Sequence, residues 1–276
     1  MSAKQDGPAW PKPDFPANNL AALAGCDLSR WIAVLPLGAT EQHGLHLPFE
    51  TDTLIAEGLI SRLKQRLVGE LPITFLATEP VGYSPEHLDW PGTKSLGFNE
   101  AVERWIRIGG DLAESGIRKL LLLNAHGGNS PLMTVVATEL RCRHAMLCVA
   151  TSWTRFGYPA DVISPEDAAL DIHAGLIETS VMLALHPDKV DMAEARNFAS
   201  AQRRFLERNR YLAAYGKHAF GWKMQDLNPA GAVGNAAEAS AETGEKLLDH
   251  AVDGLVALIG EMDRFDFGDL RHMPAR

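Results

Sequence analysis

The chain has 276 residues, 46% of them hydrophobic and 22% charged, a composition typical of a globular protein with a core of its own. Its formal net charge of −9 argues against a nucleic-acid partner or an anionic membrane, because both favour basic surfaces. No apolar run approaches the ~20 residues of a membrane span, and the three cysteines show no paired metal-ligand spacing. We therefore expect a cytoplasmic protein with reduced thiols.

Strand-like and helix-like segments alternate along the chain, which predicts an α/β fold with a parallel sheet. We expect an N-terminal arm over 1–25, a single domain over 26–265 and a C-terminal tail over 266–276. Short, mainly apolar runs are typical of strands buried on both faces, and they occur at 31–37, 71–77, 118–123 and 145–151. Helical periodicity or helix-start signals predict helices at 53–67, 99–114, 130–143, 173–185, 198–215 and 238–263.

The loop after the first strand carries the strongest candidate metal ligands. Glu41 and His43 lie two positions apart, so in an extended segment both side chains point to the same side. A carboxylate with an imidazole suits zinc, manganese or iron(II). Asp52 stands where the next helix begins, so helix capping competes with metal binding for its side chain. The alternative interpretation of this loop is a hydrogen-bonded polar turn.

A second candidate site follows the strand at 118–123, which leads into the motif Asn-Ala-His-Gly-Gly-Asn at 124–129. Open α/β sheets bind ligands at the carboxyl ends of their strands, so His126 is a better ligand candidate than an isolated histidine. Gly127 and Gly128 would allow a substrate or metal to approach the backbone closely. A phosphate cradle is the rival interpretation, but the spacing fits no P-loop.

Two further segments hold candidate site residues. The loop at 79–96 contains Ser84 and His87 among other polar and aromatic groups, and it is either a pocket wall or a surface loop. Glu178 lies among apolar residues on a predicted helix. A buried carboxylate is costly without a partner, so metal coordination and a salt bridge are both open explanations.

Taken together, these motifs resemble the creatininase (creatinine amidohydrolase) family over residues 31–248. The resemblance is carried by GATEQHGLHLP at 38–48, GYS at 82–84, PGT at 91–93, NAHGGN at 124–129, HAGLIETS at 173–180 and GAVG at 231–234. It implies a three-layer α/β/α sandwich on a mostly parallel sheet, a two-metal site at the strand ends and a homohexamer.

The resemblance also implies roles for individual residues. Glu41, His43, Asp52 and His126 fall on metal-ligand positions, with Asp52 bridging the two metals, and His173 falls on the catalytic histidine. The chain departs from creatininase at Gly127 and Gly128, where creatininase has a tyrosine and a metal-binding glutamate. The glycine version occurs in relatives that deformylate nucleotide-pathway intermediates or trim a redox-cofactor precursor peptide.

We expect Glu178 to replace the missing ligand or to act as a general base. Ser84 and the backbone of Gly127 and Gly128 are expected to hold the substrate. His46 and His87 are expected to be structural or to support the ligands.

The expected activity is hydrolysis of a C–N amide bond in a small molecule, with two divalent metal ions (Zn, Mn or Fe) per subunit. A metal-activated water would attack the carbonyl, and His173 would pass a proton to the leaving nitrogen. No Gly-x-Ser-x-Gly elbow is present, which argues against a serine nucleophile. The alternatives are a peptidase-like member that trims a cofactor-precursor peptide, or a metal-free binding subunit.

Overall fold

A four-stranded parallel sheet forms the centre of the computed structural model, which describes residues 28–67 and 71–270. The predicted N-terminal arm and residues 271–276 of the predicted tail lie outside the described residues. The sheet order is β2-β1-β3-β4, with β1 (Ile32–Leu37), β2 (Ile73–Phe75), β3 (Lys119–Asn124) and β4 (Leu147–Ser152). β1 and β3 pair along their whole length, from Ile32 opposite Lys119 to Leu37 opposite Asn124.

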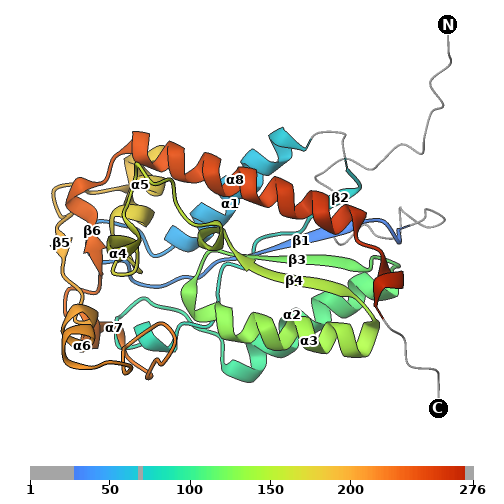
Figure 1. Ribbon diagram of the computed structural model, residues 1–276, viewed down its shortest axis with the longest axis horizontal. Coiled ribbons are helices and arrows are strands. Elements are labelled where there is room, and N and C mark those ends of the chain that lie inside the picture. The colour runs from blue at the N-terminus through green and yellow to red at the C-terminus, as the bar shows by residue number, and fades with distance from the viewer. Residues whose placement is uncertain (1–27, 68–70, 271–276) are drawn as a thin grey trace, which may run out of the picture.

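Helices cover both faces of this sheet (Figure 1). Helices α1 (Thr51–Arg66), α5 (Leu176–Leu185) and α8 (Ala241–Arg264) lie on one face, and α2 (Phe98–Glu114) and α3 (Ser130–His144) lie on the other. Successive strand residues point to opposite faces, so Ile32 and Val34 join one hydrophobic cluster while Ala33 and Leu35 join the other. The predicted three-layer α/β/α sandwich is confirmed.

Shorter elements gather beyond the end of the sheet at which β1 and β3 finish (Figure 1). They are α4 (Pro165–Ala168), α6 (Gln202–Arg208), α7 (Met224–Leu227) and the antiparallel pair of β5 (Asn197–Phe198) and β6 (Gly234–Asn235). Single 3₁₀ turns occur at Pro85–His87, Gly127–Asn129, Trp153–Phe156, Pro187–Lys189, Ala236–Glu238 and Phe267–Asp269. Across the described ranges, no helix combines the length and apolar character that a membrane span requires.

Three helix boundaries differ from the sequence prediction. The helix expected from 173 begins at Leu176, so His173 lies in the loop before α5. The helix expected over 198–215 is limited to α6, because the side-chain carbonyl of Gln202 accepts the backbone N–H of Ala214 and holds the later residues in a loop. The last helix begins at Ala241 rather than at 238, because Ser240 caps it by accepting the N–H of Thr243.

Helices α5 and α8 approach each other closely at Gly244, where an added Cβ would overlap the carbonyl oxygen of Ser180. Gly244→Ala is therefore expected to destabilise the fold by about 1–3 kcal/mol, the usual cost of overpacking. Gly260→Ala on the same helix is the matched control, since the nearest atom to its added Cβ lies 3.4 Å away. This control should gain up to about 1 kcal/mol from helix propensity. Urea unfolding of the two variants measures both effects, and equal stability would contradict the close packing.

Candidate metal centre

The candidate ligands come from three separate parts of the chain and meet beyond the carboxyl ends of β1 and β3. Glu41 and His43 lie in the loop after β1, and Asp52 lies in the first turn of α1. His126 follows β3, and Glu178 lies in the first turn of α5. The first four are buried, and the Glu178 side chain is 15% exposed. The structure therefore brings all five together in a nearly closed site.

Two sets of three potential ligands share Asp52. Glu41, Asp52 and His126 each offer one atom to the first set, and His43, Asp52 and Glu178 do so for the second, with all atoms of a set within 4.8 Å of one another. Oδ2 of Asp52 lies 3.4 Å from Nδ1 of His126, whereas Oδ1 lies 3.5 Å from Nε2 of His43. The two oxygens of one carboxylate thus face two different sets, as a bridging ligand requires.

The side chain of Asp52 is free for this position because it does not cap its helix. The N-cap of α1 is Glu50, and no side-chain hydrogen bond caps the helix there. The competition between capping and metal binding that the sequence suggested is therefore absent.

Each of the two candidate ligand histidines uses one ring nitrogen to fix its orientation. Nδ1 of His43 donates to the backbone carbonyl of Glu41 at 2.9 Å, which leaves Nε2 facing Asp52 and Glu178. Nε2 of His126 donates to the carbonyl of Tyr83 at 3.0 Å, which leaves Nδ1 facing Glu41 and Asp52. A carbonyl bound to the outer nitrogen is the usual support for a metal-ligating histidine.

Several atoms at the centre of the site are buried and have no hydrogen-bond partner within the described residues. They are both carboxylate oxygens of Glu41, Nε2 of His43 and Oδ2 of Asp52. Buried polar atoms are almost always satisfied in folded proteins, because leaving one unpaired costs about 1–3 kcal/mol. The donor set of carboxylate oxygens and imidazole nitrogens fits divalent zinc, manganese or iron.

The electrostatics of the carboxylates favour bound positive charge. Burial opposes ionisation of Glu41, but His126 and His87 outweigh it and hold the pKa of this carboxyl below its ordinary value. Burial likewise opposes ionisation of Asp52, but His43 and His126 outweigh it and hold the pKa of this carboxyl well below its ordinary value. Both groups remain anionic at neutral pH.

The raised pKa values of His43, His126 and Glu178 also show that the site favours positive charge. Burial disfavours the imidazolium of His43, but Asp52 and Glu178 raise its pKa to about 9. The pKa of His126 is well above its ordinary value because Glu41 and Asp52 overcome burial. Burial raises the pKa of Glu178 to about 8. Without a cation, protons supply the positive charge that these atoms are arranged to receive.

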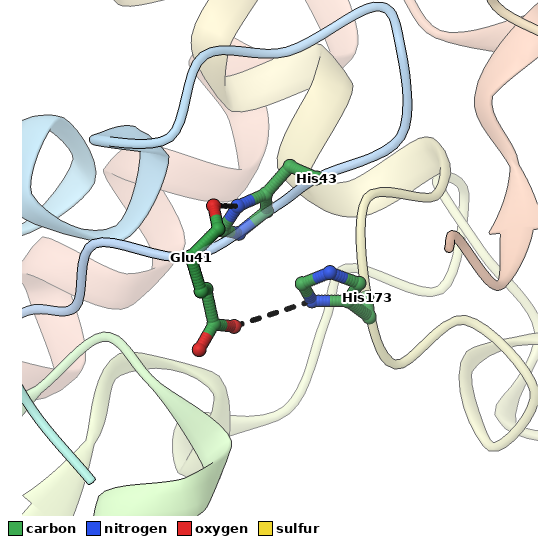
Figure 2. Close-up of side chains that lie close together, drawn as sticks. All are labelled: Glu41, His43 and His173. Atoms are coloured by element: carbon green, nitrogen blue, oxygen red, sulfur yellow. Dashed lines mark hydrogen bonds and ion pairs between the residues drawn. The ribbon is translucent and has the colours of Figure 1, made fainter. Parts of the chain in front are cut away.

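His173 lies against the same centre. Its Nδ1 is 3.6 Å from Oε1 of Glu41, and Figure 2 shows the carboxylate of Glu41 extending toward it. The His173 and His43 rings have centroids 4.3 Å apart. Burial and the neighbouring charges of His43 and His87 lower the pKa of His173 well below its ordinary value. His173 is therefore a neutral imidazole beside the ligands.

The residues expected to hold substrate have different surroundings. Ser84 is fully buried, and its Oγ lies 3.2 Å from Nε2 of His126, so it contacts a ligand from the outside. An added Cβ at Gly127 would meet nothing within 4 Å, whereas at Gly128 it would come within 2.7 Å of Oε1 of Glu86. Gly127 thus borders open space, and Gly128 does not. Their roles in substrate binding stay predictions.

Two further residues at the site, Glu86 and Gln42, were not singled out from the sequence, whereas His87 was expected to be structural or to support the ligands. Oε1 of Glu86 lies 3.9 Å from Nε2 of His126. Nε2 of His87 lies 3.3 Å from Oε1 of Glu41, and Nδ1 of His87 lies 2.9 Å from the side-chain nitrogen of Gln42. All three belong to motifs that the sequence contains, but spacing along the chain does not show that they meet. His46 instead bonds the backbone carbonyl of Ala174 through Nε2.

A parallel sheet between helical layers, with acidic and imidazole side chains able to hold metal ions at its strand ends, defines a protein of the α/β class with a candidate metal centre. Comparison with known proteins makes the assignment specific. The family model for creatininase, described as creatinine amidohydrolase, matches residues 19–259. The chain therefore belongs to the creatininase family.

Individual relatives support this assignment. The mycofactocin precursor peptide peptidase of Mycobacterium ulcerans (strain Agy99) is 31% identical over 239 residues, which cover 84% of this chain and 86% of that protein. The creatinine amidohydrolase of Pseudomonas putida is 30% identical over 254 residues, covering 83% and 89%. A mutant creatininase of Zn–Zn type has a TM-score of 0.70 at 27% identity, covering 90% of this chain and 95% of that one. The chain is a hydrolase of this family with residues able to hold metal ions.

Proposed function

We propose that the chain is a binuclear metal-dependent amidohydrolase that cleaves a C–N amide bond in a small molecule. The observation that carries this proposal is the pair of ligand sets that share Asp52. Glu41, Asp52 and His126 would hold one divalent ion, and His43, Asp52 and Glu178 the other. Zinc is the first choice of metal, because a similar creatininase is a Zn–Zn type, and manganese and iron fit the same donors.

Two such ions would acidify a water molecule and polarise the amide carbonyl. The chain's own residues would position the reactants and move protons. His173 presents a neutral Nδ1 toward the centre, so it can accept a proton from the attacking water and pass it to the leaving nitrogen. Ser84 supports His126 from the outside, and the open space at Gly127 is the proposed place for the substrate.

A second candidate function is trimming of a peptide, because a similar protein is a mycofactocin precursor peptide peptidase. Both activities use the same ligands and differ only in the substrate that enters the site. A metal-free binding subunit is the third alternative, and the unpaired buried atoms of Glu41 and His43 argue against it.

From the family we also propose that the protein forms a homohexamer and lies in the cytoplasm. Sedimentation velocity would test the oligomeric state, and cell fractionation would test the localisation.

Elemental analysis of protein purified without chelator tests the proposed function. We expect one to two transition-metal ions per chain, loss of activity with a chelator and recovery on adding metal. Hydrolysis should be assayed on formamides, creatinine and peptides with a removable terminal residue, to separate the two activities. Less than about 0.2 metal equivalents, with no metal-stimulated hydrolysis of any of these, would contradict the proposal.

Glu178→Gln tests the second ligand set. The carboxylate lies 3.8 Å from Nε2 of His43 and accepts the N–H of Ala174 at 2.7 Å, and glutamine keeps this shape while weakening the ligand. Metal content should fall toward one ion per chain while the circular dichroism spectrum stays unchanged. Glu57→Gln, on the exposed side of α1, is the matched control and should keep both ions. Wild-type affinity for both ions would mean that Glu178 is not a ligand and acts as a base or ion-pair partner.

A further inference from the structure

Gln42 contacts two histidines of the site at once. Its side-chain oxygen accepts the backbone N–H of Gly44 at 3.0 Å, which fixes the direction of the amide group. The amide nitrogen therefore faces Nδ1 of His87, 2.9 Å away. The backbone carbonyl of the same residue lies 2.8 Å from Nε2 of His173. Gln42 is itself buried, so no water competes freely for these bonds.

These contacts determine which ring nitrogen carries the proton. An amide N–H can only donate, so Nδ1 of His87 accepts and the proton of the neutral ring is on Nε2. The backbone carbonyl of Gln42 can only accept, and at 2.8 Å it lies closer to Nε2 of His173 than the Gln42 side-chain nitrogen does at 3.5 Å. Nε2 therefore carries a proton, and Nδ1 of the neutral ring is bare. A ring nitrogen that accepts a hydrogen bond carries no proton, so the contact with the Gln42 amide nitrogen makes His87 a neutral imidazole.

The two rings nevertheless present opposite groups to the same oxygen. The protonated Nε2 of His87 lies 3.3 Å from Oε1 of Glu41, and the bare Nδ1 of His173 lies 3.6 Å from that atom. The two ring centroids are 4.4 Å apart, and the ring planes are tilted by 41° relative to each other. One histidine can therefore donate a hydrogen bond to the Glu41 carboxylate, while the other keeps a lone pair directed into the site.

We propose that Gln42 is a positioning residue that sets the proton placement on both histidines, so that His87 orients the Glu41 carboxylate and His173 stays ready to accept a proton. Its value for catalysis rests on the proposed metal-dependent hydrolysis. The proton placement itself does not, because it follows from hydrogen bonds within the chain. A proton on Nε2 of His87, 3.3 Å from Oε1 of Glu41, would orient this carboxylate.

The proton placement is measured directly by long-range nitrogen–proton correlation spectra of full-length, zinc-loaded protein labelled with ¹⁵N-histidine. We expect a bare Nδ1 and a protonated Nε2 on both His87 and His173, each assigned from a single substitution. In Gln42→Glu the carboxylate can only accept, so Nδ1 of His87 should become protonated while His173, held by the backbone carbonyl, stays unchanged. A protonated Nδ1 on wild-type His87, or no change in the variant, would overturn the proposal.

Cobalt titration, followed by the visible spectrum of the bound ion, measures the consequence for the metal site. Gln42→Glu should weaken metal binding roughly 10- to 100-fold, the usual effect of losing support for a ligand, and shift the cobalt spectrum. Gln65→Glu adds the same charge on the exposed side of α1 and should change neither. In a His87→Phe background the Gln42→Glu change should add no further loss of affinity, because its effect passes through His87. If the two substitutions together lowered metal affinity by the sum of their separate effects, Gln42 would not act through His87.

The two proposals fail in different ways. If wild-type protein binds no metal but shows these protonation states in the form as purified, the proposed function fails and the role of Gln42 stands. If metal binds and amides are hydrolysed but His87 carries its proton on Nδ1, the role of Gln42 fails and the function stands. The wild-type spectrum decides this even where Gln42→Glu does not fold.

Discussion

Replacing Asp52 with asparagine is expected to empty both proposed metal positions and to lower turnover by more than about 10⁴-fold. This exceeds the roughly 10²–10⁴-fold effect of removing one general acid or base, because a single carboxylate serves both ligand sets. Its two oxygens lie 3.5 Å from the ring nitrogen of His43 and 3.4 Å from that of His126. Asparagine offers only one accepting oxygen and no charge.

Elemental analysis and calorimetric metal titration measure the effect of Asp52→Asn. The fold should persist, because no side-chain bond of Asp52 caps α1, and circular dichroism checks this. Asp111→Asn, exposed on α2, is the matched control and should keep full metal content and turnover. Retention of two ions in Asp52→Asn would show that Asp52 does not bridge them.

His173→Ala is expected to keep both metals and to lower turnover by roughly 10²–10⁴-fold. The ring presents a bare Nδ1 toward Glu41 at 3.6 Å, and its Nε2 is held by the carbonyl of Gln42. Removing it deletes the proton-accepting group without touching either set that shares Asp52. Single-turnover kinetics and metal content should be measured on the same sample.

The control for this variant is His218→Ala, since His218 is exposed on the loop after α6. It should leave both turnover and metal content unchanged. His173, Glu41 and His43 also form a third set of potential ligand atoms. Loss of one ion in His173→Ala would therefore reassign His173 as a ligand and contradict its proposed catalytic role.

The fold could be predicted from the sequence because its strongest signals are local. A strand such as β3 is covered by helices on both faces, so the run Leu120–Leu123 must be apolar throughout. The short α6 could not be predicted, because the bond that holds the following loop joins Gln202 to Ala214, twelve residues later. Side-chain contacts of that kind leave no periodic pattern in the sequence.

In the candidate site too, local features could be predicted from the sequence, and contacts between distant residues could not. Glu41 and His43 could be paired because alternate residues of an extended segment share one side, and the structure brings them to one centre. The contact between His87 and Gln42 joins residues 45 positions apart, and it depends on how the 79–96 loop lies over the site. The fold brings His87 and Gln42 together, and their spacing along the chain gives no sign of the contact.

The packing of α5 on α8 has a consequence for the order in which the candidate site would be completed during synthesis. Glu178 is in the first turn of α5, and this helix meets α8 at the close approach of Gly244 to Ser180. The ribosome makes the chain from its N-terminus, and α8 ends only at Arg264. A nascent chain can thus gather Glu41, Asp52 and His126 long before Glu178 is secured. If a metal ion binds at the proposed His43 position, its binding would then show that α8 has packed against α5.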